Sequence, residues 1–452
     1  MFALPGLVAL ILVEYLRPQE YFESLRGLPL LHLAAALAGI GLVVDLRLGL
    51  TRLRAAPHLL LASLFFLWCL VTLTVRAPDQ LASRATTLLI PFSMYLLVAH
   101  GLQTFRALQV VAATILAICL ALAALGIHQA MQPLECRAPK VVQGVMTAVS
   151  DGRACTRHVD CEGEGAEPGE TYECERGGLL GTFSIMGRVR YRGSLADPNE
   201  LALALSVALP FAFALYDRRR STARLALAAV AVVMVGLCAY FTQSRGGQLV
   251  FLAVLGAYFV NSVGLWRGGV SGLLLSLPIL VLGGRSGGEA STMERTECWW
   301  VGLHLLGQSQ GLGVGAGQFT EHHFLTAHNT FILAAAELGV PGLLLWTSLA
   351  WLCLKIPAQV LRSQAAPVAR SWALALLASL IGLLVGVFFL SFLYRDVLWL
   401  YVGLTGVLYG AVRRHDPGFE VRFGVRDLAA VAAVDAVLLA ALTGFTVSKL
   451  GW

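Results

Sequence analysis

The sequence predicts an all-α, polytopic membrane protein with about 12–13 transmembrane helices. Of its 452 residues, 57% are hydrophobic and only 13% are charged, whereas soluble domains carry about 25% charged residues. Apolar runs of about 20 residues, long enough to cross a bilayer as a helix, recur along almost the whole chain. A backbone in lipid must satisfy its own hydrogen bonds, so these runs favour helices over barrel strands.

The expected spans follow one another with two long interruptions. The first apolar run is short, which also allows an interfacial position, and no small-residue cleavage site follows it. We therefore expect it to remain as an uncleaved anchor. The thirteen expected spans lie near residues 3–16, 28–46, 57–75, 81–100, 107–131, 197–216, 225–241, 247–264, 270–284, 328–354, 371–392, 397–412 and 427–447.

The net charge of +6 indicates membrane topology, because Lys and Arg favour short cytoplasmic loops. With the N-terminus inside, the inner loops hold sixteen Lys and Arg residues, with DRRRSTAR at 217–224 as the strongest anchor. No basic patch is interleaved with aromatic residues, so we expect no nucleic-acid partner. The short outer loops and tail hold only seven basic residues: Arg17, Arg26, Arg76, Arg84, Arg245, Arg395 and Lys449.

Two long polar segments separate groups of spans, and the charge assignment places both on the outer face. A protein with its two largest loops on one face is expected to act there. The expected order is an N-terminal helical part, an outer cysteine-containing loop, central helices, a second outer loop and C-terminal helices. Their limits are 1–131, 132–196, 197–284, 285–327 and 328–452.

The first outer loop contains four of the nine cysteines. Its stretch CTRHVDCEGEGAEPGETYEC is polar and rich in Gly and Glu, so we expect no core of its own. An oxidising location favours two disulfides, in any of three pairings, and a zinc site that also uses His158 is the alternative. Cys298, in the second loop, has no obvious partner. The four clustered cysteines are Cys136, Cys155, Cys161 and Cys174.

The stretch YRGSLADPNELALAL at 191–205 predicts a helix that begins at the outer surface. Asp197 suits the N-cap, Pro198 the first helical position and Glu200 a capping box. Arg192 precedes this start, with two further arginines at 188 and 190. A helix N-terminus carries positive partial charge, so the stretch is either an anion site or a well-capped helix with interfacial arginines.

TQSRGGQLVFL at 242–252 places Arg245 in a short outer turn, after a possible cap at Ser244. A lone interfacial arginine is usually a snorkelling anchor. The two adjacent glycines would also let a ligand approach the backbone. Both interpretations stay open.

The second outer loop predicts a helix over 292–306 that lies on the interface, because Trp299, Trp300, Leu303 and Leu306 share a sector. Arg295 is near its start. GLGVGAGQF at 311–319 lacks the Gly-Lys-Ser/Thr ending of a P-loop and indicates tight turns. The histidines at 322, 323 and 328 lack the HExxH pattern, so we expect no metal.

AHNTFILAAAELGVPGLLLW begins at Ala327 and places His328 and Asn329 in the first turn of a span. Glu337 is nine residues after His328, roughly on the opposite side of an ideal helix. It is expected to pair with another helix or to act as a buried acid near GVPG, which should kink the span. Ionisable groups inside a membrane suggest function. Asp435 stands alone among alanines, and packing or assembly is the favoured role.

The ordered set RGSLADPNELA, SRGG, an arginine-led aromatic segment, GLGVGAGQF and AHNTFILAAAELGVPG resembles the O-antigen ligase and O-antigen polymerase superfamily. EYLRPQEYF near the N-terminus is also similar to several members. The resemblance covers roughly 190–350 by motif and the rest by hydropathy. The cysteine-containing loop departs from the family pattern, and the short segment around Arg295 leaves the acceptor class open.

The resemblance implies a GT-C-like glycosyltransferase of the bacterial inner membrane, with a cytoplasmic N-terminus and a periplasmic active site. Such enzymes move a glycan from an undecaprenyl diphosphate carrier to a glycan, lipid or protein acceptor, without a cofactor. Membrane lipids and other polysaccharide-assembly proteins are the further expected partners. By this similarity Arg245 and Arg295 hold the diphosphate and His328 is the periplasmic histidine. The expected substrate-binding residues are Arg192, Asp197, Asn199, Asn329 and Glu337.

Two other functions remain open from the residues. A transporter or flippase would use Glu337, Asp435 and the broken span as its coupling path. Transport sites lie near mid-membrane, however, whereas the candidate arginines and histidine gather at one face. A sensor whose cysteine-containing loop binds a partner would leave the arginines unexplained.

Overall fold

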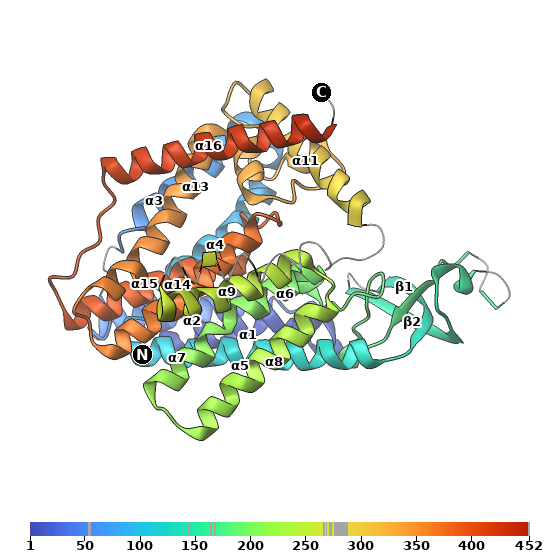
Figure 1. Ribbon diagram of the computed structural model, residues 1–452, viewed down its shortest axis with the longest axis horizontal. Helices are drawn as coiled ribbons and strands as arrows, with labels where there is room; N and C mark the ends of the chain where they lie inside the picture. The colour runs from blue at the N-terminus through green and yellow to red at the C-terminus, as the bar shows by residue number, and fades with distance from the viewer. Residues whose placement is uncertain are drawn as a thin grey trace. The chain divides into compact units, whose positions relative to one another are not determined.

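The computed structural model describes residues 1–52, 56–142, 145–162, 165–166, 169–264, 267, 269–270, 274 and 288–450. It is mostly helical (Figure 1). Nine helices of the described residues are long and apolar enough to cross a membrane, so the chain is a multi-pass membrane protein. These spans are Leu30–Arg47, Leu59–Arg76, Pro78–Gly101, Phe105–Met131, Pro198–Arg218, Thr222–Phe241, Thr330–Arg362, Pro367–Val387 and Val425–Leu450.

Twelve of the thirteen expected spans coincide with helices, three of which fall outside these nine. Expected span 270–284 lies almost wholly outside the described residues. The helices are α1 (Ala3–Leu16), α2 (Leu30–Arg47), α3 (Leu59–Arg76), α4 (Leu81–Gly101), α5 (Phe105–Met131), α6 (Pro198–Ala208), α7 (Pro210–Arg218), α8 (Thr222–Phe241), α9 (Arg245–Val263), α11 (Gly288–Gln308), α12 (Phe319–His322), α13 (Thr330–Arg362), α14 (Pro367–Val387), α15 (Asp396–His415) and α16 (Val425–Leu450). The three outside the nine are α1, α9 and α15.

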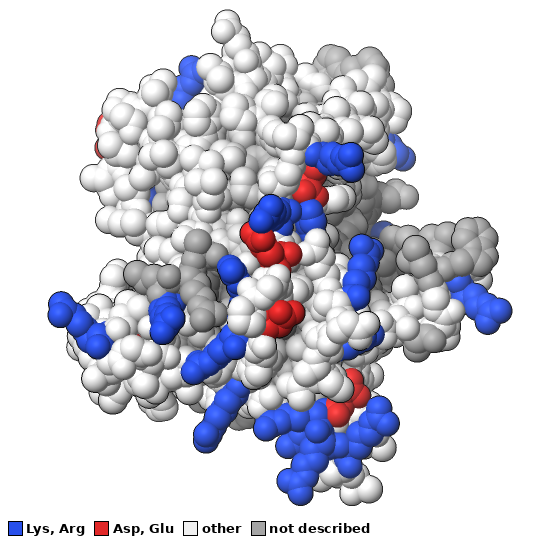
Figure 2. All heavy atoms as spheres, turned by 90° about the vertical axis from the view of Figure 1, so that its left-hand side faces the viewer, with Lys and Arg blue, Asp and Glu red and all other residues white. Residues whose placement is uncertain are grey.

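The exterior is suited to lipid. Many large apolar side chains on α2, α3, α8 and α16 are exposed, which is costly in water and favourable in a bilayer. The face drawn in Figure 2 has broad uncharged areas, and Lys and Arg outnumber Asp and Glu on it.

The chain forms two compact units that do not follow sequence order. Unit 1 contains Met1–Leu7, Ala35–Val110 and Arg285–Trp452, and unit 2 contains Val8–Ala34 and Val111–Gly284. The helices α1, α2 and α5 therefore each contribute to both units.

Unit 1 is built around α13, which packs against α3, α11, α14, α15 and α16. The indole Nε1 of Trp68 on α3 donates to the carbonyl of Leu338 on α13 at 2.7 Å. The α4–α15 contact is close because Gly403 and Gly406 present no side chain to α4. The N-terminal end of α1 is fixed by Asp45, whose carboxylate accepts from the backbone N–H of Phe2 at 2.8 Å.

Unit 2 contains the buried helix α6, which packs against α8 and α9. Pro198 begins this helix, and Asp197 caps it by accepting from the N–H of Asn199 at 2.7 Å. The expected cap at Ser244 also forms, because its hydroxyl accepts from the N–H of Gly247 at 2.9 Å. Both predicted helix starts are confirmed.

Part of the cysteine-containing segment 132–196 folds into a three-stranded antiparallel sheet of order β2-β1-β3 (Figure 1). The strands are β1 (Leu134–Val142), β2 (Val145–Ala154) and β3 (Glu173–Arg176). The sheet departs from the all-α expectation, because β-branched residues in β1 and β2 favour a hairpin. Disulfides join Cys136 to Cys161 and Cys155 to Cys174. With Ala138 and Tyr172 they form a small core. The stretch 155–174 therefore reaches a core only together with residues of β1.

Candidate functional site

The glycine-rich segment 311–319 forms a turn structure against α13. Gly311, Gly313, Gly315 and Gly317 all have positive φ, between 72° and 110°. Only glycine adopts such angles readily, which explains why it occurs at every second position. The predicted tight-turn region is confirmed, and the segment is named the glycine loop below.

The glycine loop pairs with α13 where that helix is interrupted. Gly339 has φ 69° and ψ −170°, so the predicted break at GVPG is confirmed. The N–H groups of Val314 and Gly315 donate to the carbonyls of Ala336 and Glu337 at 2.9 and 2.8 Å. The N–H of Val340 donates in return to the carbonyl of Gly311 at 2.8 Å. Backbone groups freed by the break are thus satisfied by the loop.

Glu337 fixes the end of the glycine loop. It is 2% exposed, and its two carboxylate oxygens accept from the N–H groups of Gly317 at 2.8 Å and Phe319 at 3.0 Å. The hydroxyl of Tyr394, before α15, donates to the same carboxylate at 2.8 Å. Of the two roles expected for Glu337, that of a buried acid near the GVPG break is confirmed. Its partners are the N–H groups of Gly317 and of Phe319, the first residue of α12, and the hydroxyl of Tyr394.

Two arginines border the glycine loop. A Cβ added at Gly315 would lie 3.1 Å from Cβ of Arg76, and one at Gly317 would lie 3.6 Å from the side chain of Arg84. Arg84 also lies 3.9 Å from the carboxylate of Glu321. Its Nε donates to Gln80, which accepts as well from Gln318 of the loop at 3.0 Å. The segments 76–84 and 315–321 therefore lie side by side.

Arg295 lies on α11, one turn before Cys298, and is partly buried. Cys298 is fully buried, with its sulfur 3.8 Å from Nδ1 of His323. Burial, together with the charge of Glu297, raises the pKa of this thiol to about 11, so it is protonated at neutral pH. The contact ties α11 to the segment that leads to His328.

A helix covers the predicted range 292–306, and its interfacial position stays a prediction. The buried face differs from the predicted sector. Thr296, Cys298, Trp299 and Leu305 are buried, whereas Trp300 is only partly buried and stacks on His304. Trp299 packs against Phe388 and Phe445.

His328 and Asn329 precede the first turn of α13 and do not form it. Asn329 is the N-cap, and its fully buried side chain accepts from the N–H groups of Phe331 and Ile332 at 2.9 and 3.1 Å. His328 has φ 48°, a conformation that costs a non-glycine residue about 1–3 kcal/mol and that clusters at functional sites. His328 is partly exposed.

In unit 2 the predicted residues form a second cluster. The carboxylate of Asp197 accepts from the side-chain nitrogen of Asn199 at 2.8 Å, and Oδ1 of Asn199 accepts from Arg188 at 3.1 Å. Arg188 also donates to the carbonyl of Thr242 at 2.9 Å. The network therefore joins the start of α6 to the turn that presents Arg245.

Arg245 is the first residue of α9 and is exposed. One of the two adjacent glycines has a packing role, because a Cβ at Gly247 would collide with Ala202 on α6. Gly247 is thus needed for helix contact, which corrects its interpretation as space for a ligand.

Arg192 is held by the protein itself. Its guanidinium is buried and donates to the carbonyls of Glu20 at 3.0 Å, Leu180 at 2.9 Å and Gly181 at 2.6 Å. Burial lowers its pKa, and the nearby Glu20 opposes this shift. Three carbonyls of unit 2 therefore hold the Arg192 guanidinium in place, and its expected role in substrate binding stays a prediction.

The structure thus gathers the predicted residues into two sets. Arg295, His328, Asn329 and Glu337 belong to unit 1, and Asp197, Asn199 and Arg245 belong to unit 2. Convergence of Arg245 with Arg295 and His328 stays a prediction. Arg76, Arg84, Arg188 and Tyr394 have site contacts that the sequence analysis did not assign. For Arg76 and Arg84 a signal was present, because both are among the few basic residues of the expected outer loops.

No protein-family model matches this chain, and no curated protein matches it.

Proposed function

We propose that the protein is a glycosyltransferase that takes a glycan from a polyprenyl diphosphate carrier. The reaction takes place at the periplasmic face of the inner membrane. The acceptor is a sugar or a lipid, as in surface-polysaccharide polymerases and ligases. The observation that carries the proposal is the anchoring of the glycine loop by Glu337, with Arg76 and Arg84 along the loop and His328 leading into α13. Within unit 1 these features supply a fixed loop, two cations beside it and a partly exposed histidine.

A diphosphate leaving group develops negative charge, and arginine side chains can neutralise it. In the proposed step, an acceptor hydroxyl attacks the anomeric carbon, the bond from that carbon to the diphosphate oxygen breaks, and polyprenyl diphosphate leaves with the electron pair. Arginine forks neutralise its charge by bidentate hydrogen bonds and stay protonated. Arg245 and Arg295 are proposed for this role, with Arg84 as a further cation.

The hydroxyl proton also needs an acceptor. A histidine near neutrality is suited to this, and general-base help contributes about a hundred- to ten-thousand-fold. His328 is proposed as this base. Its backbone is held by Asn329 as N-cap and by the following Thr330, whose hydroxyl donates to the carbonyl of Leu390 at 2.6 Å.

The contacts of Glu337 count against the transporter alternative. A coupling carboxylate must exchange its proton or ion, whereas Glu337 is buried and accepts from two loop N–H groups and a tyrosine hydroxyl. Releasing it would leave those N–H groups buried without a partner, which costs about 1–3 kcal/mol for each group. A loop anchor is therefore the better-supported role.

Deletion of the gene, followed by analysis of envelope glycans, tests the proposal. Acceptors capped with a single repeat would indicate a polymerase, and long chains retained on the carrier would indicate a ligase. Both defects should disappear when the wild-type gene is restored. Unchanged glycans in the deletion strain would refute the proposal.

A further inference from the structure

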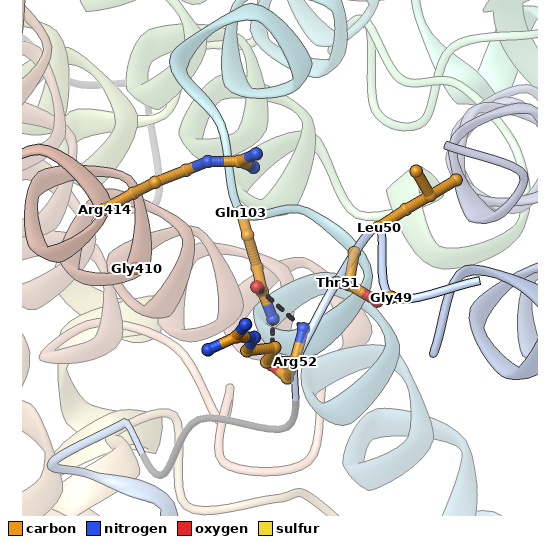
Figure 3. Close-up of a pocket in the computed structure, with 7 residues that line it drawn as sticks. All are labelled: Gly49, Leu50, Thr51, Arg52, Gln103, Gly410 and Arg414. Atoms are coloured by element: carbon orange, nitrogen blue, oxygen red, sulfur yellow. Dashed lines mark hydrogen bonds between the residues drawn. The ribbon is translucent and has the colours of Figure 1, made fainter. Parts of the chain in front are cut away.

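Unit 1 contains a polar pocket that is lined by none of the residues proposed above for glycan transfer. It has a volume of about 280 Å³ and lies between the segment after α2, the residues after α4 and the last turns of α15 (Figure 3). Its wall includes the side chains of Thr51, Arg52, Gln103 and Arg414. One water molecule takes up about 30 Å³ in the liquid, so the pocket is large enough for a small polar group.

The pocket wall is preorganised by backbone contacts. After α2 the chain turns back at Gly49, which has φ 67°, and the N–H groups of Leu50 and Thr51 donate to the carbonyl of Asp45 at 2.9 and 3.3 Å. The side chain of Gln103 then binds both backbone groups of Arg52: it accepts from the N–H at 3.2 Å and donates to the carbonyl. Arg52 is thus fixed at its backbone while its guanidinium remains exposed.

The two arginines bring positive charge that the surrounding protein does not neutralise. Arg414 extends from α15 toward Gln103, and Arg52 lies beside the same side chain (Figure 3). Neither guanidinium forms an ion pair with any residue in the described part of the chain. No acidic residue is among the described residues that line the pocket. Two uncompensated guanidinium forks beside polar groups favour an anion with several acceptor oxygens.

We infer that this pocket binds a phosphate group through Arg52 and Arg414. Phosphate matches the bidentate donors of arginine. The pocket lies at the ends of α2 and α4, both of which are membrane-spanning, and basic pockets at such positions hold anionic lipid headgroups. A soluble phosphate compound offers the same chemistry, so the experiment separates the two sources.

The test uses the full chain, purified in a neutral detergent, and follows its thermal unfolding midpoint. Phosphatidylglycerol, phosphatidylcholine and inorganic phosphate are titrated separately into wild-type protein, Arg52→Ala, Arg414→Ala and the double variant. The matched control is Arg220→Ala, which removes an exposed arginine from the loop between α7 and α8 in unit 2. Because Arg52 and Arg414 are exposed, their truncation should leave folding intact, and gel filtration checks this.

For a lipid headgroup, phosphatidylglycerol should raise the wild-type midpoint and phosphatidylcholine should not. Each single variant should bind phosphatidylglycerol about tenfold or more weakly, and Arg220→Ala should behave as wild type. A rise with inorganic phosphate, lost in the same variants, would support the site with a soluble ligand.

The inference fails if neither anion stabilises the wild type, or if Arg220→Ala weakens binding as much as the pocket variants do. If the double variant does not fold, Arg414→Gln alone decides, because it removes one fork at the exposed end of α15. Wild-type binding by Arg414→Gln would then overturn the inference.

Discussion

The carboxylate of Glu337 accepts a hydrogen bond from the backbone N–H of Gly317, 20 residues earlier in the chain, at 2.8 Å. A charged residue in an apolar helix is costly unless it is paired or hydrogen-bonded. The carboxylate of Glu337 instead anchors the glycine loop to α13, just before the break at Gly339. The acid is thereby explained by loop geometry.

Glu337→Gln should loosen the glycine loop. The amide keeps one acceptor oxygen but places an NH₂ group against an N–H of the loop, so we expect a loss of about 1–3 kcal/mol in stability and a lower thermal midpoint. The matched control is Glu321→Gln, whose side chain is 55% exposed and should change the midpoint little. Equal midpoints for Glu337→Gln and wild type would contradict the anchoring role.

Gly339→Ala should be more damaging than an ordinary glycine replacement. Position 339 has φ 69°, and an added Cβ would collide with the backbone of Gly311 and Leu312. The backbone strain alone costs about 1–3 kcal/mol. Gly307→Ala is the control, because nothing lies within 4 Å of its added Cβ. Thermal unfolding of the two variants side by side is the measurement, and similar midpoints would argue against the loop–helix pairing.

Arg192→Ala should destabilise unit 2, because it leaves the carbonyls of Glu20, Leu180 and Gly181 without their donor. Lysine lacks the planar fork, so Arg192→Lys should restore only part of the lost stability. The measurement is the rate of limited proteolysis in the segment around residue 180, where two of these carbonyls lie. A fully stable Arg192→Ala protein that has lost activity would instead favour the substrate-binding role.

Arg245→Ala, Arg295→Ala and His328→Ala should each remove most glycan transfer while the protein still inserts into the membrane. Loss of one charge-stabilising donor costs about 3–4 kcal/mol in the transition state, or roughly a hundred- to a thousand-fold in rate. Complementation of a deletion strain, with membrane levels measured by immunoblot, tests this. Wild-type glycan profiles from two of these variants would overturn the site assignment.

Counting free thiols tests whether the two disulfides of the three-stranded sheet form. Unfolded, unreduced protein should bind five maleimide labels, one for each free cysteine, and reduced protein should bind nine. Mass spectrometry of the labelled chain counts them. Nine labels before reduction would mean that the two disulfides do not form.

The features predicted from sequence are those set by neighbouring residues. The cap at Asp197, the break at Gly339 and the turns of the glycine loop each follow from residue types within a few positions. The sheet of β1, β2 and β3 was not predicted, because the polar composition of the segment hides the β-branched residues that favour these strands.

Roles set by distant partners were not predicted. The carbonyl partners of Arg192, at residues 20, 180 and 181, could not be predicted, because sequence spacing does not reveal them. The N–H partners of Glu337 come from a loop that precedes it, and helical periodicity says nothing about such contacts.

The division of unit 1 has a consequence for biosynthesis. His58 contacts the carbonyl of Val402, 344 residues later, and Trp68 reaches Leu338, 270 residues later. The partners of these two residues are 270 and 344 residues later in the chain, and ribosomes add roughly 5–20 residues per second. The early helices therefore wait roughly 14–70 s in the bilayer before these partners are made. During that interval they need a chaperone, an insertase or lipid to cover the surfaces that α13 and α15 later occupy.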